Sequence, residues 1–264
     1  MALIFVKLGG SIITDTKKEN TPLPAEISRL VCEIRDGGDG SKIILGHGSG
    51  SFGHVAAHRY ELQKGLHRED SAIGAAITRK VAANLNSYVI DSMLDNGMNA
   101  LSFPPSAGGI TSNKRIVDWN IEPIKRALDH GFIPVVMGDV AIDTEKGIAV
   151  IPTEEPFRYL AEKLRPDKVI VASDIDGVFT ADPHMDKDAR LVGLITRENY
   201  EEALSHTGSS LKVDVTGGMR SKLAYLYDIS EKYGATCQIV NATVPGRLRD
   251  AVAGREVIGT VIKA

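Results

Sequence analysis

Short apolar runs alternate along this chain with longer stretches in which apolar residues recur every three or four positions. The short runs are rich in β-branched residues and predict buried strands, whereas the longer stretches predict amphipathic helices. Strands are expected at 2–7, 42–46, 99–102, 133–137, 148–151, 168–172, 237–240 and 257–262, and helices at 24–36, 70–96, 120–130, 154–164, 197–204, 217–232 and 245–253. This alternation predicts an α/β protein with an open, mainly parallel central sheet and helices on both faces.

The longest expected helix, 70–96, carries an apolar residue at every fourth position. The members of this stripe are Ile73, Ile77, Val81, Leu85 and Val89. We expect the stripe to face the body of the protein or a pocket.

Length and composition allow one large domain or two closely joined lobes, because the chain has 264 residues of which 43% are apolar. The segment Arg165-Pro166-Asp167 predicts a hinge between such lobes, and the polar segment 180–196 is expected to run over the surface. The net charge of −3 argues against nucleic acid as the main partner. Cys32 and Cys237 are expected to be reduced thiols. Nothing resembles a signal peptide or the roughly 20 apolar residues of a membrane span, so a cytoplasmic protein is predicted.

Two glycine-rich segments follow the first two expected strands. They are Lys7-Leu8-Gly9-Gly10-Ser11 and Gly46-His47-Gly48-Ser49-Gly50-Ser51-Phe52-Gly53-His54. Glycines after a strand let backbone N–H groups approach an anion, because no Cβ stands in the way. Lys7 adds positive charge, and His54 can donate a hydrogen bond to a phosphate oxygen. The pair of segments predicts a site that handles phosphate, although a solvated lysine and a structural histidine are the alternatives.

Two segments in the second half of the chain also fit phosphate or nucleotide chemistry. Asp214-Val215-Thr216-Gly217-Gly218-Met219 leads into a helix that carries Lys222, and a helix start attracts anions. Ser173-Asp174-Ile175-Asp176-Gly177 follows an apolar strand. There Asp174 or Asp176 could bind a ribose hydroxyl or hydrated magnesium, or simply form a turn. The pair Gly138-Asp139 repeats this arrangement after another strand.

Several other site types are excluded or weakly supported. The chain lacks G-x-x-x-x-G-K-[ST], so it is not a P-loop nucleotide binder. Residues 48–53 match the letters of G-x-G-x-x-G, but no acidic residue stands at the expected distance after them. His47, His58 and His67 have no ligand-like spacing, so no transition-metal site is expected.

Together these residues resemble the amino acid kinase superfamily, and within it the isopentenyl phosphate kinases. The resemblance covers nearly the whole chain, and Ser51-Phe52-Gly53-His54 narrows it, because relatives that phosphorylate amino acids lack this histidine. A fosfomycin kinase shares the histidine. The resemblance implies an αβα sandwich in two lobes. Residues 1–165 would bind the acceptor and form a homodimer, and residues 166–264 would bind ATP.

The resemblance also assigns roles to single residues. Lys7 would contact the transferring phosphoryl group, and Lys222 would hold the β- and γ-phosphates of ATP. His54, with the N–H groups of Gly50 and Gly53, would hold the acceptor phosphate.

Three family positions depart from the usual pattern here. A family lysine after the first glycine segment is displaced, and Lys17 is preferred to Lys18 for its role. The carboxylate that orients the catalytic lysines is Glu154 or Glu155, with Glu154 favoured by spacing. Ser49 stands where glycine is usual, and must tolerate a tight backbone.

The remaining implied contacts fall into two groups. ATP is expected to contact Gly9, Gly10, Ser173, Asp174, Asp176, Gly177, Asp182, Thr216, Gly217 and Gly218. The acceptor phosphate is expected to contact Gly48, Ser49, Gly50, Gly53 and Gly138, and an apolar tail would pack on Ile73, Ile77, Val81, Val140 and Val150.

The expected activity is ATP-dependent phosphorylation of isopentenyl phosphate to isopentenyl diphosphate. Mg²⁺ would ride on the ATP phosphates, without a dedicated metal site in the protein. One alternative is a kinase for another small phosphate or phosphonate such as fosfomycin. A second is a non-catalytic protein of the same fold that binds nucleotide or oxyanion.

Overall fold

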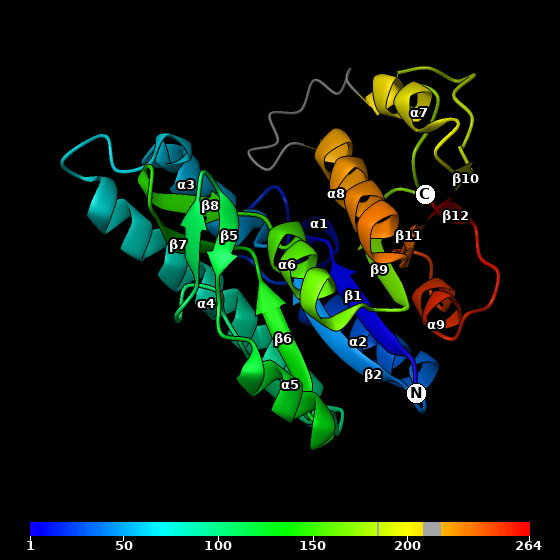
Figure 1. Ribbon diagram of the computed structural model, residues 1–264, viewed down its shortest axis with the longest axis horizontal. Helices are drawn as coiled ribbons and strands as arrows, with labels where there is room; N and C mark the ends of the chain where they lie inside the picture. The colour runs from blue at the N-terminus through cyan, green and yellow to red at the C-terminus, as the bar shows by residue number, and fades with distance from the viewer. Residues whose placement is uncertain (184, 208–217) are drawn as a thin grey trace.

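Within the residues that the structure describes, 1–183, 185–207 and 218–264 of a computed structural model, the apolar runs form an eight-stranded central sheet (Figure 1). In order across the sheet the strands are β10 (Leu194–Ile195), β12 (Gly259–Ile262), β11 (Thr236–Asn241), β9 (Lys168–Ser173), β1 (Leu3–Leu8), β2 (Lys42–His47), β6 (Ile133–Met137) and β3 (Ala100–Ser102). All neighbouring strands are parallel except β11 and β12. The predicted mainly parallel sheet is confirmed.

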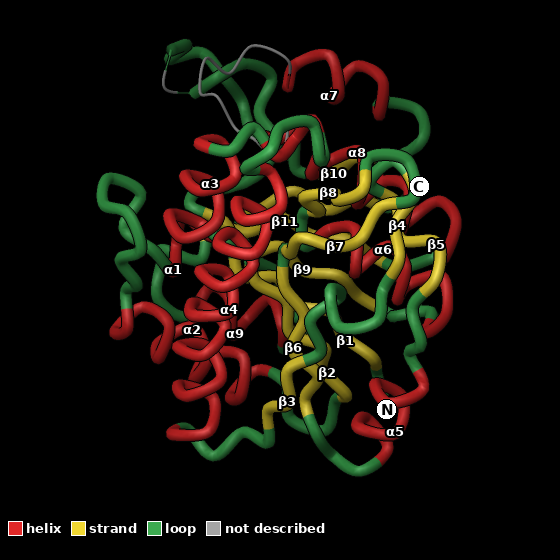
Figure 2. Tube along the Cα trace, turned by 90° about the vertical axis from the view of Figure 1, so that its left-hand side faces the viewer, coloured by secondary structure: helices red, strands yellow, loops and turns green. Residues whose placement is uncertain are grey.

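Helices cover both faces of this sheet (Figure 2). One face carries α2 (Pro24–Gly37), α4 (Ser71–Asp95) and α9 (Arg247–Val252), and the other carries α5 (Glu122–Asp129), α6 (Glu154–Leu164) and α8 (Gly218–Tyr233). Side chains of successive strand residues point to opposite faces. Phe5 and Ile44 therefore pack with α5, α6 and α8, whereas Val6 and Leu45 pack with α2, α4 and α9. Burial on both faces explains why these strands are apolar without alternation.

A second sheet of four strands has the order β5 (Arg115–Asp118), β4 (Ile110–Ser112), β7 (Asp139–Asp143) and β8 (Gly147–Ile151). It contacts α4 through β7. Only β8 is predicted from the sequence. The others, like β10 in the large sheet, are short or mixed in polarity and give a weak periodic signal. The seven predicted helices are present, including α7 (Tyr200–His206), with ends shifted by up to three residues.

The second glycine segment contains a helix that the sequence does not reveal. The structure places α3 at Gly50–Arg59, after a short α1 at Gly10–Ile13 and before the 3₁₀ turn η1 at Leu62–Lys64. His54 therefore lies in the second turn of a helix, whereas the sequence suggests that it closes a loop. Glycines lower helix propensity and hide the signal, whereas the burial of Phe52 and Ala57 in two different apolar clusters stabilises the helix.

The predicted four-residue stripe of α4 is only partly buried. Leu85 and Val89 are fully buried, but Ile73 is 58% exposed and Ile77 is 37% exposed. A strict four-residue spacing drifts by roughly 40° per step around a helix of 3.6 residues per turn, so five such positions cannot share one face.

Although α4 has 25 residues, none of the helices in the described ranges combines the length and the apolarity that crossing a membrane requires.

The parallel arrangement brings the carboxyl ends of β1, β2, β6 and β9 to one edge of the sheet. Ligands of open α/β sheets bind at this edge. The predicted hinge lies at the opposite edge, where the Asp167 N–H donates to the Leu3 carbonyl oxygen at 2.9 Å and the Leu3 N–H donates to Asp167 Oδ2 at 2.8 Å. Since β9 pairs directly with β1, the sheet continues across the predicted boundary at residue 165. The division into two lobes stays a prediction.

Candidate active site

The two glycine segments lie against each other at the carboxyl edge of the sheet. The Gly48 N–H donates to the Leu8 carbonyl oxygen at 2.9 Å. A Cβ on Gly10 would stand 2.4 Å from the Gly50 nitrogen, which no side chain tolerates. Gly50 has a φ of +49°, the left-handed conformation that favours glycine. The two segments therefore form one continuous backbone surface, as their shared edge predicts.

Thr14, to which the sequence analysis assigns no role, connects the two glycine segments through hydrogen bonds. Its buried hydroxyl donates to the Gly10 carbonyl oxygen at 2.8 Å and accepts the Ser51 N–H at 3.1 Å. One side chain thus joins the first segment to the start of α3. Threonine after a short helix carries no distinctive sequence signal, because its partner is 37 residues away.

Ser49 adopts an ordinary backbone conformation. Its φ of −82° and ψ of −15° are allowed for any L-residue, so the usual glycine is not required at this position. The Ser49 carbonyl oxygen accepts the N–H of Phe52 at 3.0 Å and that of Gly53 at 3.4 Å. The Gly53 N–H, predicted to hold the acceptor phosphate, is thus engaged within the first turn of α3.

Ser51 and His54 stand three residues apart on α3 and so share one side of the helix. Ser51 is 9% exposed, and its hydroxyl has no hydrogen-bond partner among the described residues. A buried hydroxyl without a partner is unfavourable in a folded protein, and a bound oxyanion would satisfy it. Ser51 is therefore a second candidate donor beside His54 that the sequence analysis did not assign.

Lys7 and Glu154 form a buried ion pair. Lys7 Nζ lies 2.5 Å from Glu154 Oε1, and the two side chains are 7% and 6% exposed. Burial alone would raise the pKa of Glu154, but the charge and hydrogen bond of Lys7, and the charge of Lys222, lower it below its usual value. Glu154 is thus held as a carboxylate that interacts with both predicted catalytic lysines.

The carboxylate of Glu155 binds other groups than the two lysines, which distinguishes it from that of Glu154. Its Oε1 accepts from Arg158 at 2.7 Å and from the Ile116 N–H at 2.8 Å, and its Oε2 accepts from Arg115 at 3.0 Å. These bonds anchor the start of α6 to β5. Geometry therefore favours Glu154 for the role beside the lysines.

Lys17 and Lys18 lie in the exposed loop between α1 and α2. The Lys17 N–H donates to Asp15 Oδ1 at 2.9 Å, which shapes the loop backbone. Their exposed positions leave the choice between these lysines as a prediction.

The residues after β9 lie next to the first glycine segment. The Gly9 N–H donates to the Ala172 carbonyl oxygen at 2.8 Å. The Ser173 hydroxyl donates to Asp174 Oδ1 at 3.3 Å, and Asp176 forms an ion pair with Arg247. No group of three or more His, Cys, Asp or Glu side chains in the described ranges is arranged to hold a metal ion.

The rest of the predicted ATP contacts are distributed as follows. Gly177 continues the turn after β9, and the Asp182 carbonyl oxygen accepts the N–H groups of residues 185 and 186. Gly218 opens α8 with a φ of +59°, and Lys222 follows one turn later. Thr216 and Gly217 lie outside the described residues, as does most of the 214–219 motif.

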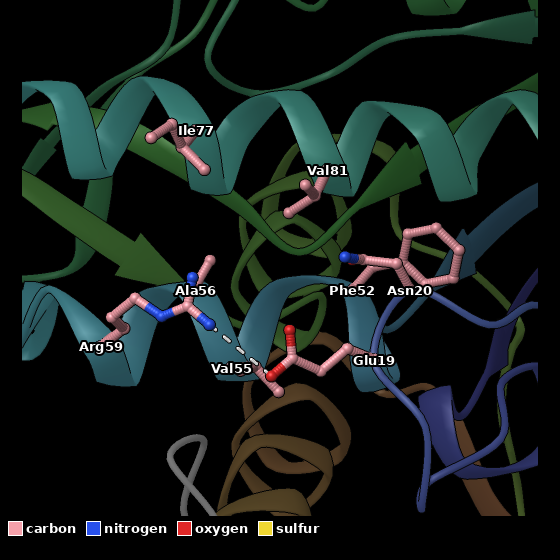
Figure 3. A pocket seen from close by; sticks show the side chains of 8 residues that line it. All are labelled: Glu19, Asn20, Phe52, Val55, Ala56, Arg59, Ile77 and Val81. Atoms are coloured by element: carbon pink, nitrogen blue, oxygen red, sulfur yellow. Dashed lines mark ion pairs between the residues drawn. The ribbon is translucent and has the colours of Figure 1, made fainter.

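The residues predicted to hold an apolar tail separate into two places. Ile77 and Val81 line a small cavity of about 60 Å³ between α3 and α4 (Figure 3). The other residues that line it are Glu19, Asn20, Phe52, Val55, Ala56 and Arg59. Val140 and Val150 instead pack in a different cluster, with Ala57 of α3. Ile73 is exposed on α4.

The helical positions show which of the two places lies nearer His54. At 100° per residue, Ala57 lies roughly 60° from His54 around α3, whereas the four α3 residues that line the cavity, Phe52, Val55, Ala56 and Arg59, lie roughly 100–160° away. The Val140 and Val150 side is therefore nearer to His54 than the cavity that Ile77 lines.

Gly138 contacts the second glycine segment through His47, which the sequence analysis considers only as a metal ligand and excludes from that role. The Gly138 N–H donates to the His47 carbonyl oxygen at 3.2 Å, and the Thr153 hydroxyl donates to the same oxygen at 2.7 Å. Thr153 directly precedes Glu154. The end of β2 is thus connected to β6 and to the helix that carries the carboxylate.

Comparisons with known proteins agree with this geometry. The model of the amino acid kinase family matches residues 2–241. The chain is 36% identical to the isopentenyl phosphate kinase of Methanothermobacter thermautotrophicus, over 98% of each chain, and 31% identical to that of Thermoplasma acidophilum, over 99% of this chain and 100% of the other. A solved structure described as "X-ray structures of isopentenyl phosphate kinase" superposes with a TM-score of 0.85 at 33% identity, covering 99% of this chain and 100% of the other.

Proposed function

The chain belongs to the amino acid kinase family, and we propose that it transfers the γ-phosphoryl group of ATP to isopentenyl phosphate, giving isopentenyl diphosphate. Full-length similarity to isopentenyl phosphate kinases supports this substrate. The observation that carries the proposal is the joined glycine surface with His54 on α3, at the sheet edge where Lys7 is the last residue but one of β1. Such a surface suits an acceptor that already carries phosphate.

The chemistry needs positive charge more than it needs a base. A phosphate monoester is largely ionised at neutral pH, so its oxygen is already a nucleophile. The barrier comes from bringing two anions together, and fixed cations and N–H groups offset their repulsion. We assign the transferring group to Lys7, the acceptor phosphate to His54 and Gly50, the donor phosphates to Lys222, and a supporting charge to Lys17.

Glu154 acts on the lysines and not on the substrate. A buried lysine would otherwise lose its proton readily, and the 2.5 Å contact to Glu154 stabilises the ammonium form. The remaining assignments follow the family. ATP binds residues 166–264, Mg²⁺ accompanies its phosphates as their counterion, and two copies associate through residues 1–165.

A coupled assay of ADP release, with isopentenyl phosphate and fosfomycin as parallel acceptors, tests the proposed function. The proposal expects rapid turnover with isopentenyl phosphate and much lower kcat/KM with fosfomycin. A preference for fosfomycin would support the alternative kinase, and ATP binding without turnover of either acceptor would support a non-catalytic binder.

The apolar residues predicted to contact the substrate tail lie in two different places, and this arrangement predicts which residue limits the length of the tail. Val150→Ala should raise kcat/KM for a ten-carbon prenyl phosphate about tenfold relative to isopentenyl phosphate, because it removes apolar bulk from the cluster on the side of α3 nearer His54. Ile77→Ala enlarges the cavity between α3 and α4. It serves as the matched control and should leave this ratio unchanged. Competition between the two acceptors in one reaction measures the ratio. The opposite pattern would place the tail between α3 and α4.

A further inference from the structure

His47 ends β2 as a buried histidine that the proposed mechanism does not use. Its side chain lies in the interior, since the residue is 1% exposed. Nδ1 lies 3.1 Å from the Gly48 carbonyl oxygen, and Nε2 lies 3.0 Å from Oδ1 of Asn86 on α4. Asn86 Nδ2 in turn donates to Ser102 Oγ at 2.8 Å. The ring therefore lies between the acceptor glycine segment and the core.

The ring is neutral in this position. Burial lowers the pKa of His47, and the positive charge of Lys7 on β1 lowers it too, against the hydrogen bonds of Asn86 and Gly48 and the charge of Asp139 on β7, which raise it. A neutral imidazole has one N–H donor and one acceptor nitrogen. It cannot donate to the Gly48 oxygen and the Asn86 oxygen at the same time.

One arrangement satisfies every group. With the Asn86 amide turned by 180°, which exchanges two atoms of equal size, Nδ2 donates to His47 Nε2 and Oδ1 accepts the Ser102 hydroxyl. The ring proton then stands on Nδ1 and donates to the Gly48 carbonyl oxygen. With the amide unturned, Nδ1 carries a lone pair toward that oxygen, which repels it.

We propose that His47 is a positioning residue whose Nδ1–H donates to the Gly48 carbonyl and sets the orientation of the Gly48–Ser49 peptide for the acceptor phosphate. The Gly48–Ser49 peptide bond is trans, like every peptide bond in the described ranges, so the Ser49 N–H points opposite to the Gly48 carbonyl and therefore away from the ring. This inference rests on the proposed function and names the N–H as the group through which Ser49, an expected acceptor contact, binds the phosphate. His47 acts through this peptide and does not touch the substrate.

A matched pair of variants tests the proposal. The amide nitrogen of asparagine superposes on Nδ1, and that of glutamine on Nε2. His47→Asn should therefore keep KM for isopentenyl phosphate within about threefold of the wild type, whereas His47→Gln should raise it about tenfold, as expected for a lost hydrogen bond. KM for ATP should change little in either variant. His58→Gln, at an exposed position on α3, controls for histidine replacement.

The ring tautomer is read in the wild-type protein, so this test does not depend on the activity of a variant. ¹⁵N shifts of labelled histidine, with the His47 signal identified by its loss in His47→Asn or His47→Gln, should show the neutral Nδ1–H form at pH 7. An Nε2–H form, or an equal rise of KM in the two variants, would overturn the proposal. If the wild-type protein did not phosphorylate isopentenyl phosphate, the proposed function would fail, whereas the tautomer would still report on the bond to Gly48.

Discussion

Lys7→Met should lower kcat for phosphorylation of isopentenyl phosphate by about 10³-fold. A loss of this size is typical when one fixed positive charge that stabilises a developing anion is removed. Lys7 is the last residue but one of β1, which leads into the glycine surface, and its buried ammonium group contacts Glu154. Methionine keeps the length and apolar stem of the side chain but not the charge. Single-turnover kinetics with saturating ATP measures the chemical step directly.

The ion pair makes a stability control necessary. Lys7→Met leaves Glu154 buried without its partner, which should cost about 3–5 kcal/mol in the free energy of unfolding. The double variant Lys7→Met, Glu154→Gln removes both charges and should recover most of that stability, as measured by urea denaturation. It should not recover activity. Restored turnover in the double variant would show that Lys7 serves folding and not phosphoryl transfer.

His54→Ala should lower kcat/KM for isopentenyl phosphate by about 10²–10³-fold, because it removes a donor aimed at an anion, while Kd for ATP stays within about twofold. The side chain lies in the second turn of α3, on the same side of the helix as Ser51. Calorimetry measures ATP binding, and steady-state kinetics measures use of the acceptor.

His58→Ala is the matched control for His54. It removes a histidine from the same helix at an exposed position one turn further on, and should leave both quantities unchanged. A comparable loss of ATP binding in His54→Ala would place the histidine on the donor side and reverse our assignment of the two glycine segments.

Much of the site follows from the sequence because parallel strands bring their carboxyl ends to one edge. Lys7 and Gly48 are far apart in the chain, but both follow apolar runs that form adjacent parallel strands, so their proximity is predictable. The choice of Glu154 over Glu155 was open from the sequence. The two are separated by the contact of Lys7 with Glu154 and by the partners of Glu155 in β5, a strand too short to predict.

Other features depend on tertiary packing and leave no local signal. A helix that starts with glycines, such as α3, is stabilised by buried Phe52 and Ala57 and not by propensity. The stripe of α4 drifts around its helix, so Ile77 lines the cavity between α3 and α4 and not the cluster in which Val150 of β8 packs. The contacts of Thr14 and His47 join segments that only the fold brings together.

A crystal structure of the protein with isopentenyl phosphate tests the central claim most directly. Our account predicts the phosphate between His54 and the Gly48–Gly50 backbone, within hydrogen-bond distance of the Ser51 hydroxyl, with the isopentenyl tail toward Val140 and Val150. A phosphate bound instead at the start of α8 beside Lys222, or a tail seated between α3 and α4, would contradict it.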